Sequence, residues 1–178
     1  MAIHSNNIIT KDLFNNDPTF WDDDPAECNC GSYALNIVEW YYPYEDREMR
    51  DDWIESMLAN GFTMEEAREE VFAEDVYNME AQFGDYLVPI DSPDNIPNEV
   101  EVIAYRVSLT YDPWDNIYYD FHFKVRRGGY WSEKCGMDEV RPCALQADET
   151  WDNGGCLQYD STIQYFAVNP LAYKEEVF

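Results

Sequence analysis

The sequence predicts an α+β fold, in which helices come first along the chain and a mostly antiparallel sheet follows. Apolar residues recur every three to four positions over residues 30–84, which is the spacing of amphipathic helices. Apolar and polar residues instead alternate in several short runs within residues 98–178, which is the spacing of strands. Since 178 residues is the length of one ordinary domain, we expect a single domain over residues 1–178, with a mostly helical part followed by a mostly β part.

The composition is that of a folded and strongly acidic protein. Hydrophobic residues make up 46% of the chain and aromatic residues 16%, which is more than a disordered acidic tail contains. The 37 acidic and 11 basic residues give a formal net charge of -26, which excludes direct binding to nucleic-acid phosphates or to an anionic membrane and favours a basic partner. The sequence shows no secretion signal and no membrane-spanning run, so we expect a cytoplasmic protein.

The stretch CNCGSYAL, residues 28–35, is typical of the start of a helix. Asn29 is a suitable N-cap, because its side chain can accept a hydrogen bond from a free backbone N–H of the first turn. Apolar residues continue at helical spacing until Pro43 ends the run. The residues expected on the buried face of this first helix are Cys30, Ala34, Ile37, Val38 and Tyr41.

Two further helices are predicted, and together they form an antiparallel hairpin. The first covers about residues 45–60, and Gly61 follows it at the position of a C-terminal cap. The second begins at the capping box that Thr63 and Glu66 form, and it ends before Gly84. The residues expected on the buried side of the first of these two helices are Met49, Trp53, Ile54, Met57 and Leu58.

Strands are predicted after a proline-rich connection. Runs of strand character occupy residues 100–109, 118–127 and 161–168. In the second run, aromatic and aliphatic side chains form one face, and His122 lies on the opposite, polar face. We expect the apolar face to point into the main core and the face of His122 to point away from it.

The glycines at positions 128 and 129 predict a two-residue hairpin turn that leads into the segment YWSEKC. The register of such a hairpin places Lys124 opposite Glu133 and His122 opposite Cys135. His122 and Glu133 are then diagonal neighbours, with β-carbons roughly 7 Å apart. This spacing allows the glutamate to hold one nitrogen of the imidazole ring.

Cys30 and His122 form a candidate catalytic pair. The free N–H groups at a helix N-terminus and the positive end of the helix dipole stabilise a thiolate, which is the nucleophilic form of cysteine. His122 can then act as a general base, and Glu133 can orient its ring. The alternative for Cys30 is a small buried apolar side chain without chemistry, because free cysteines are among the most buried residues.

The residues around this pair resemble a known family. NCGSYAL, residues 29–35, is similar to the nucleophile segment Asn-Cys-x-x-Tyr-Ala-Leu of a family of small bacterial and phage proteins. DFHF and GGYWSEKCG, within residues 120–136, resemble the segments Asp-Tyr-His-Phe and Gly-x-Trp-Ser-His-Lys-Pro-Gly of the same family. That family in turn resembles the NlpC class of papain-like cell-wall peptidases, in which a cysteine on a helix, a histidine on a strand and a third polar residue on the next strand form the site.

The resemblance implies a papain-like fold with an N-terminal nucleophile helix, into which the acidic helical hairpin is inserted. It implies a thiol hydrolase of the peptidase or amidase type, encoded by a phage or a mobile element, that acts on a peptide or amide substrate in the host cytoplasm. Cys30 would be the nucleophile, His122 the general base and Glu133 the orienting residue, with no cofactor and no metal. The family has a histidine where this chain has Glu133 and a proline where it has Cys135.

A zinc site is the alternative chemistry for the same residues. Several cysteines and His122 offer enough ligands, but the sequence has no C-x2-C pair, and C-x-C spacing at a helix start suits tetrahedral coordination poorly. The acid run at residues 22–24 lacks the alternating ligands of a calcium loop, so we expect it to be solvated. The cysteines considered for zinc are Cys28, Cys30, Cys135 and Cys143.

The acidic charge supports an alternative function of a different class. Carboxylates are dense in YEDREMRDDWIESM and in TMEEAREEVFAEDVYNMEAQFGD, which cover the predicted helical hairpin. Such a hairpin can present carboxylates at spacings comparable to duplex phosphates, and so fill the basic groove of a nucleic-acid enzyme. The alternative is therefore a nucleic-acid-mimic inhibitor of the anti-restriction or anti-CRISPR type, on a catalytically inactive papain-like scaffold whose partner is a basic protein. The third possibility for these charges is an acidic surface that only keeps the protein in solution.

Overall fold

A computed structural model describes residues 28–37, 40–111, 116–136, 138–152 and 157–169. The helices are α3 (Cys30–Leu35), α4 (Arg47–Ala59) and α5 (Met64–Phe83), followed by a 3-10 turn, η3 (Gly84–Tyr86). The strands are β1 (Leu87–Ile90), β2 (Val102–Tyr111), β3 (Ile117–Arg127), β4 (Tyr130–Lys134), β5 (Val140–Pro142), β6 (Trp151–Asp152), β7 (Gln158–Tyr159) and β8 (Gln164–Val168). The predicted α+β class, with helices first and a mostly antiparallel sheet afterwards, is confirmed.

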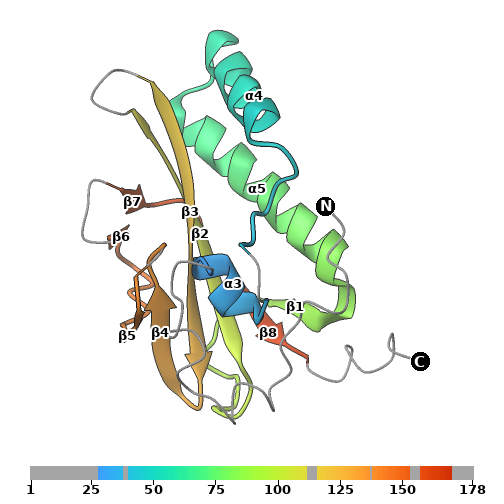
Figure 1. The fold of residues 1–178 in the computed structure, drawn as a ribbon, viewed down its shortest axis with the longest axis vertical. Helices are drawn as coiled ribbons and strands as arrows, with labels where there is room; N and C mark the ends of the chain where they lie inside the picture. The colour runs from blue at the N-terminus through green and yellow to red at the C-terminus, as the bar shows by residue number, and fades with distance from the viewer. Residues whose placement is uncertain (1–27, 38–39, 112–115, 137, 153–156, 170–178) are drawn as a thin grey trace.

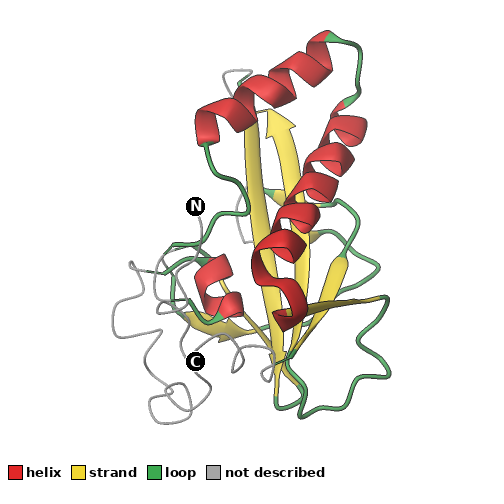
Figure 2. Cartoon of the chain, turned by 90° about the vertical axis from the view of Figure 1, so that its right-hand side faces the viewer, coloured by secondary structure: helices red, strands yellow, loops and turns green. Residues whose placement is uncertain are grey.

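The long strands β2 and β3 form the centre of a six-stranded sheet. Its order within the described residues is β1-β8-β2-β3-β4-β5, and each neighbouring pair is antiparallel. Helices α4 and α5 lie on one side of the long strands, and the short β6 and β7 pair lies on the other (Figure 1). Figure 2 shows α4 and α5 in front of the strands when the molecule is viewed from the helical side. Apolar side chains of α3, α4, α5, β2 and β3 belong to one cluster, so the helical part and the β part share a core.

The predicted helical hairpin is confirmed as α4 and α5. The side chain of Asp46 caps α4 by accepting a hydrogen bond from the backbone N–H of Met49 at 3.0 Å. The capping box predicted for α5 is present, because Thr63 and Glu66 satisfy each other's backbone N–H groups. Gly84 caps the C-terminal end of α5.

The prediction that Met49 lies on the buried side of α4 is wrong, because its side chain is 72% exposed and the next residue, Arg50, is buried. Arg50 is buried because a charged partner lies inside the core: its Nη2 donates to Oδ1 of Asp75 on α5 at 2.6 Å. The hydroxyls of Tyr105 on β2 and Tyr119 on β3 both donate to Oδ2 of the same carboxylate at 2.6 Å. This buried polar cluster joins two helices to two strands.

The expectation that the face of His122 points away from the main core is confirmed, because the main cluster takes the aromatic and aliphatic side chains of the other face of β3, but this polar face is not exposed. His122 and Lys124 on β3 are both buried. A second apolar cluster, which contains Trp151 of β6 and Tyr159 of β7, covers this face of the sheet. The reason is that β6 and β7 fold back across the polar face, so that both faces of β3 are enclosed.

The first helix is shorter than predicted, because α3 ends at Leu35. Asn36 adopts the left-handed conformation, with φ of 56°, which asparagine tolerates better than most residues, and this conformation stops the helix. Tyr41 is buried as predicted, but it lies beyond the helix. Val38 and the acid run at residues 22–24 lie outside the described residues.

Candidate functional site

Asn29 organises the chain around Cys30. Its Oδ1 accepts hydrogen bonds from the backbone N–H groups of Ser32 at 2.9 Å and of Tyr41 at 3.2 Å. Its Nδ2 donates to the carbonyl of Tyr41 at 2.7 Å. The side chain of Ser32 accepts in return from the backbone N–H of Asn29, which completes a capping box. The predicted N-cap is therefore confirmed, and it also holds the returning chain beside the helix.

Gly31 allows α3 to approach its neighbours closely. A β-carbon at this position would lie 2.7 Å from Cδ1 of Tyr41 and 3.3 Å from the ring of Phe123, which is closer than side-chain atoms tolerate. The absence of a side chain at Gly31 therefore brings the start of α3, and with it Cys30, against strand β3.

Cys30 lies in the first turn of α3 as predicted, and its side chain is buried. Its thiol donates to the carbonyl oxygen of Phe121 at 3.7 Å, and the backbone N–H of Phe123 also interacts with the sulfur. The sulfur therefore lies against the edge of β3 on either side of His122. Beyond the end of β4 this edge has no strand partner among the described residues, so it can receive the helix.

The expectation that Cys30 is a thiolate is wrong for this structure, although the helix N-terminus acts in that direction. Burial raises the pKa of the Cys30 thiol far above its usual range, and the negative charge of Asp120 raises it further. The N–H groups of Phe123 and Gly31 act in the opposite direction, but their effect is smaller than that of burial. The thiol is therefore protonated at neutral pH.

His122 and Glu133 are in direct contact. The hairpin register is confirmed as predicted, because Arg127 pairs with Tyr130 and Lys124 pairs with Glu133. Nε2 of His122 lies 3.0 Å from Oε2 of Glu133, and both side chains are buried. Burial alone would raise the pKa of Glu133, but the hydrogen bond and the charge of His122, together with Lys124, lower it. Glu133 is therefore ionised at neutral pH and holds the imidazole by one defined nitrogen.

Two cations surround the carboxylate of Glu133. Arg141 on β5 donates from Nε to Oε1 of Glu133 at 3.0 Å and from Nη2 to the sulfur of Cys135 at 3.2 Å. Nζ of Lys124 lies 3.9 Å from Oε2 of Glu133. The negative charge that faces the imidazole is therefore itself held in place from the other side.

Two aromatic side chains also pack against the ring of His122. The ring of Tyr159 stacks on the imidazole with centroids 5.1 Å apart and an interplanar angle of 28°. Its hydroxyl donates to Oδ2 of Asp120 at 2.8 Å, which anchors the tyrosine to the same strand as His122. Trp151 contacts the imidazole edge-on at a centroid distance of 6.4 Å. The ring is therefore held by stacking as well as by its hydrogen bond.

The structure thus brings His122 and Glu133 together, but it does not join Cys30 to them by a hydrogen bond. Among the described residues, the hydrogen bond of the imidazole goes to Glu133, and that of the thiol goes to Phe121. Catalysis by this pair would require the thiol to exchange its hydrogen bond with the carbonyl of Phe121 for one with the imidazole.

A group with possible metal ligands overlaps this site. The ligand atoms of His122, Glu133 and Cys135 all lie within 4.8 Å of one another. Within the described residues this group does not include Cys28, Cys30 or Cys143, so the predicted zinc set is not assembled as a unit. Burial and the charge of Glu133 raise the pKa of Cys135, and Arg141 already bonds both the thiol and the carboxylate. A cation would have to displace the guanidinium.

Sequence reasoning missed three residues of the site: Tyr159, Asp120 and Arg141. Asp120 lies two residues before His122 on the same strand face, so the alternation of the strand carried a signal for it. Tyr159 and Arg141 belong to strands of only two and three residues, which have no recognisable periodicity. Their places depend on how the chain after Lys134 folds back over the sheet.

Comparisons of this chain with protein-family models, with curated proteins and with solved structures find no match. In the described part of the chain, no helix has the length and apolar content needed to cross a bilayer.

Proposed function

We propose that this protein is a papain-like thiol hydrolase of the peptidase or amidase type, in which Cys30 is the nucleophile, His122 the general base and Glu133 the orienting residue. One observation carries the proposal. The sulfur of Cys30 lies against the backbone on either side of His122, whose Nε2 is held by the carboxylate of Glu133. A thiol, an imidazole and an orienting carboxylate in that sequence form the general arrangement for activating a nucleophile.

The hydrogen bond to Glu133 determines which nitrogen can act. Because Nε2 faces Glu133, Nδ1 is the nitrogen that is left to accept a proton from the thiol of Cys30. In the proposed reaction, Nδ1 takes the thiol proton while the sulfur attacks the carbonyl carbon of the substrate. The imidazolium then gives that proton to the leaving nitrogen as the C–N bond breaks, and a thioester remains. A water molecule that gives a proton to His122 hydrolyses the thioester, and the proton returns to the sulfur.

The raised pKa of the Cys30 thiol specifies how this reaction begins. A buried thiol next to Asp120 is protonated before the substrate binds, so proton transfer to His122 must accompany the attack. This behaviour is that of a hydroxyl nucleophile with a neighbouring base, and it differs from that of a preformed thiolate–imidazolium pair. The ionised Glu133 supports this step, because it stabilises the imidazolium that forms.

The proposal is tested by exposing the protein to a mixture of unrelated peptides and following cleavage by mass spectrometry. Wild-type protein is expected to cleave a subset of the peptides, and Cys30→Ala is expected to abolish this cleavage. Cys28→Ala is the matched control, because Cys28 is also a buried cysteine and lies two positions before Cys30 in the chain. Cleavage that survives Cys30→Ala, or a wild-type protein that cleaves nothing, contradicts the proposal.

A nucleic-acid mimic is the second candidate, and the outward charge of α4 and α5 supports it. The arginines of these helices are already paired with carboxylates, Arg47 with Asp51 and Arg68 with Asp160. The exposed carboxylates of the two helices are Glu48, Asp52, Glu55, Glu65, Glu66, Glu70, Glu74 and Glu80. A titration against a heparin-binding nucleic-acid enzyme at rising salt tests this function. Binding should weaken steeply with salt, and binding that does not respond to salt contradicts it.

Both candidates place the protein in the cytoplasm. Among the described residues, Cys30, Cys135 and Cys143 are thiols that form no disulfide, which is the form that a reducing compartment maintains.

A further inference from the structure

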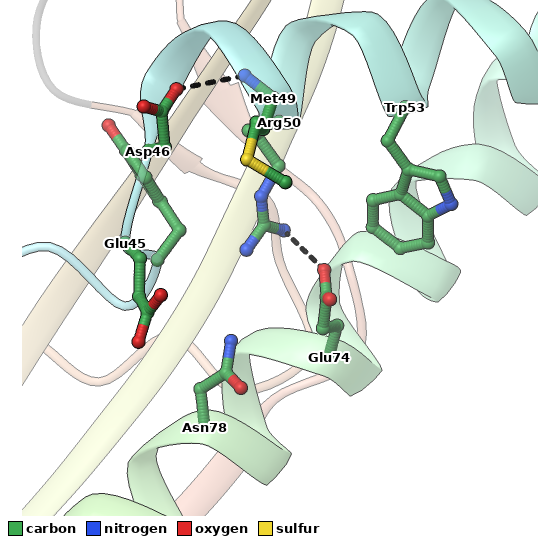
Figure 3. Close-up of a pocket in the computed structure, with 8 residues that line it drawn as sticks. Glu45, Asp46, Met49, Arg50, Trp53, Glu74 and Asn78 are labelled. Atoms are coloured by element: carbon green, nitrogen blue, oxygen red, sulfur yellow. Dashed lines mark hydrogen bonds and ion pairs between the residues drawn. The ribbon is translucent and has the colours of Figure 1, made fainter.

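A pocket of about 470 Å³ lies between the start of α4 and the middle of α5. Figure 3 shows it with Arg50 on its inner side, Glu74 and Asn78 projecting from α5, and Trp53 further along α4. Its lining combines aromatic, apolar and acidic side chains with one guanidinium and one amide, contributed by Tyr44, Glu45, Asp46, Met49, Arg50, Trp53, Glu74 and Asn78. This lining has the chemistry needed to bind a cation on an apolar stem.

The pocket already stabilises one guanidinium group. That of Arg50 lies 5.3 Å from the ring centroid of Tyr44 and 5.6 Å from that of Trp53, and its Nη1 lies 3.5 Å from Oε2 of Glu74. The main partner of Arg50, however, is Asp75, at 2.6 Å on the buried side. Because Asp75 supplies the main counter-charge of Arg50, the three carboxylates of the pocket lining give the pocket a net negative charge.

The rim offers charge and apolar contact together. The side chain of Glu74 is 46% exposed, and Glu45 and Asp46 are exposed at the opposite end of the pocket. Met49 is 72% exposed and lines the same pocket, so it offers an apolar and flexible contact surface there. Arginine and lysine side chains match this combination, since each has an apolar stem and a cationic end.

A row of aromatic rings connects the pocket to Cys30. Tyr44 lines the pocket, and its ring lies 5.4 Å from that of Tyr42. Both rings contact Phe121, at centroid distances of 6.1 Å for Tyr42 and 6.5 Å for Tyr44. Phe121 is the residue whose carbonyl accepts the hydrogen bond of the Cys30 thiol. An extended peptide with one side chain in the pocket and its backbone over Tyr44 and Tyr42 therefore runs towards the part of β3 against which the buried thiol of Cys30 packs.

We propose that the pocket between α4 and α5 binds the basic side chain of a peptide, and arginine in preference to lysine because a planar guanidinium can stack on Tyr44 or Trp53 while it pairs with Glu74. This inference rests on the proposed hydrolase function, for which it names the substrate class: peptides with an arginine or lysine near the bond that is cleaved. The binding itself needs no catalytic step, so it can be measured separately.

The test is a titration of the Cys30→Ala protein with the blocked tripeptide acetyl-Gly-Arg-Gly-amide, followed by NMR through the indole N–H signal of Trp53. The matched ligand replaces arginine with citrulline, which has the same shape without the charge. We expect the arginine peptide to bind and the citrulline peptide to bind at least about tenfold more weakly. Equal binding of the two peptides overturns the proposal.

Matched variants separate the pocket from the general acidic charge. Glu74→Gln removes a carboxylate from the pocket, and Glu70→Gln removes one from the exposed side of α5 one turn earlier, outside the pocket lining. We expect Glu74→Gln to weaken binding about fivefold and Glu70→Gln to leave it within about twofold. Equal effects of the two variants mean that the charge attracts the peptide diffusely, and they overturn the proposal. Glu45→Gln is the second pocket variant, in case Glu74→Gln lowers the unfolding temperature through its contact with Arg50.

The outcomes distinguish this inference from the hydrolase proposal. If arginine binds in the pocket but wild-type protein cleaves no peptide, the pocket stands and the hydrolase fails. If wild-type protein cleaves peptides through Cys30 without a basic residue near the cut, the hydrolase stands and the role of the pocket in substrate choice fails.

Discussion

His122 and Glu133 are diagonal neighbours on β3 and β4, and their Nε2 and Oε2 atoms lie 3.0 Å apart in a buried environment. The contact follows from a two-residue turn, because that turn sets the register that brings the glutamate next to the imidazole. It also fixes which nitrogen of the ring is engaged, because Nε2 is the atom that contacts the carboxylate.

Replacing Glu133 should have a larger effect on the rate of peptide cleavage than on the stability of the fold. Glu133→Ala removes the partner of Nε2 and should lower the rate of peptide cleavage by at least about tenfold, because the imidazole loses its orientation and the charge that stabilises its protonated form. Glu133→Gln should retain part of the rate, since an amide oxygen can still accept from Nε2. Cleavage rates and urea unfolding of both variants check this. The control is Glu139→Ala, which replaces an exposed glutamate between β4 and β5. Equal rates for Glu133→Ala and wild type would show that the pair is structural.

Cys30 should react slowly with iodoacetamide in the absence of substrate. Burial and Asp120 raise the pKa of its thiol, so at pH 7.5 its alkylation should be at least about tenfold slower than that of glutathione, and should accelerate with pH up to about pH 10 without a plateau. Asp120→Asn removes the negative charge next to the thiol and should accelerate the alkylation. Asp138→Asn is the control and should leave the rate unchanged. Mass spectrometry of the labelled peptide measures this. A plateau near neutral pH would mean that the thiolate already exists at rest.

Tyr159 should have two separate contacts: its ring holds the imidazole of His122, and its hydroxyl binds the carboxylate of Asp120. Tyr159→Phe keeps the stacked ring and removes the 2.8 Å hydrogen bond, so we expect a loss of about 1 kcal/mol in the free energy of unfolding and a nearly normal cleavage rate. Tyr159→Leu also removes the stacking and should lower the cleavage rate severalfold. The control is Tyr130→Phe, which removes the hydroxyl of an exposed tyrosine at the start of β4. If Tyr159→Leu cleaves as fast as Tyr159→Phe, the ring does not position His122.

Asp75 should make the stability of the protein depend on pH. Burial raises its pKa to about 6 from 3.8, although Arg50, Tyr105 and Tyr119 act to lower it. A carboxyl with a raised pKa in the folded state binds its proton more tightly there than in the unfolded chain, so its contribution to stability is lost as the pH rises. The linkage predicts a fall of about 1 kcal/mol in the free energy of unfolding between about pH 5 and pH 7.

Urea unfolding of wild type and Asp75→Asn at several pH values isolates this contribution. The difference in free energy of unfolding between the two proteins should fall with rising pH, because asparagine does not titrate. A constant difference would mean that Arg50 and the two tyrosine hydroxyls fully compensate for burial of the carboxylate.

Gly31→Ala should destabilise the protein although alanine favours helices. The added β-carbon would lie 2.7 Å from Cδ1 of Tyr41, so the residue that Asn29 holds beside the helix must move. Overpacking of this kind costs about 1–3 kcal/mol. Thermal unfolding measures the loss, and the rate of Cys30 alkylation shows whether α3 has moved away from β3. Unchanged stability would show that Tyr41 relaxes without cost.

The sequence predicted the features that depend on neighbouring residues. The N-cap at Asn29 and the capping box at Thr63 were predictable, because a cap is a contact between residues at most three positions apart. The contact of His122 with Glu133 was predictable for a similar reason, since a glycine turn fixes the register of a hairpin. The helical hairpin of α4 and α5 followed from apolar spacing and from Gly84 at its end.

The features that the sequence left open depend on segments far apart in the chain. The spacing of Asp75 from Val71 places it on the buried face of α5, but only the fold shows that Arg50 and two tyrosine hydroxyls from other elements make burial of its carboxylate tolerable. Likewise, His122 is enclosed because Tyr159 folds back over its strand.

The sequence by itself therefore determined the caps, the hairpin register, the class of the fold and the proximity of His122 to Glu133. Only the tertiary structure decided the state of Cys30. Its place in the first turn of α3 favours a thiolate, but its burial against β3 keeps the thiol protonated. The physical reason is that desolvation depends on everything packed around the sulfur, and for this buried sulfur it outweighs the few backbone N–H groups of a six-residue helix.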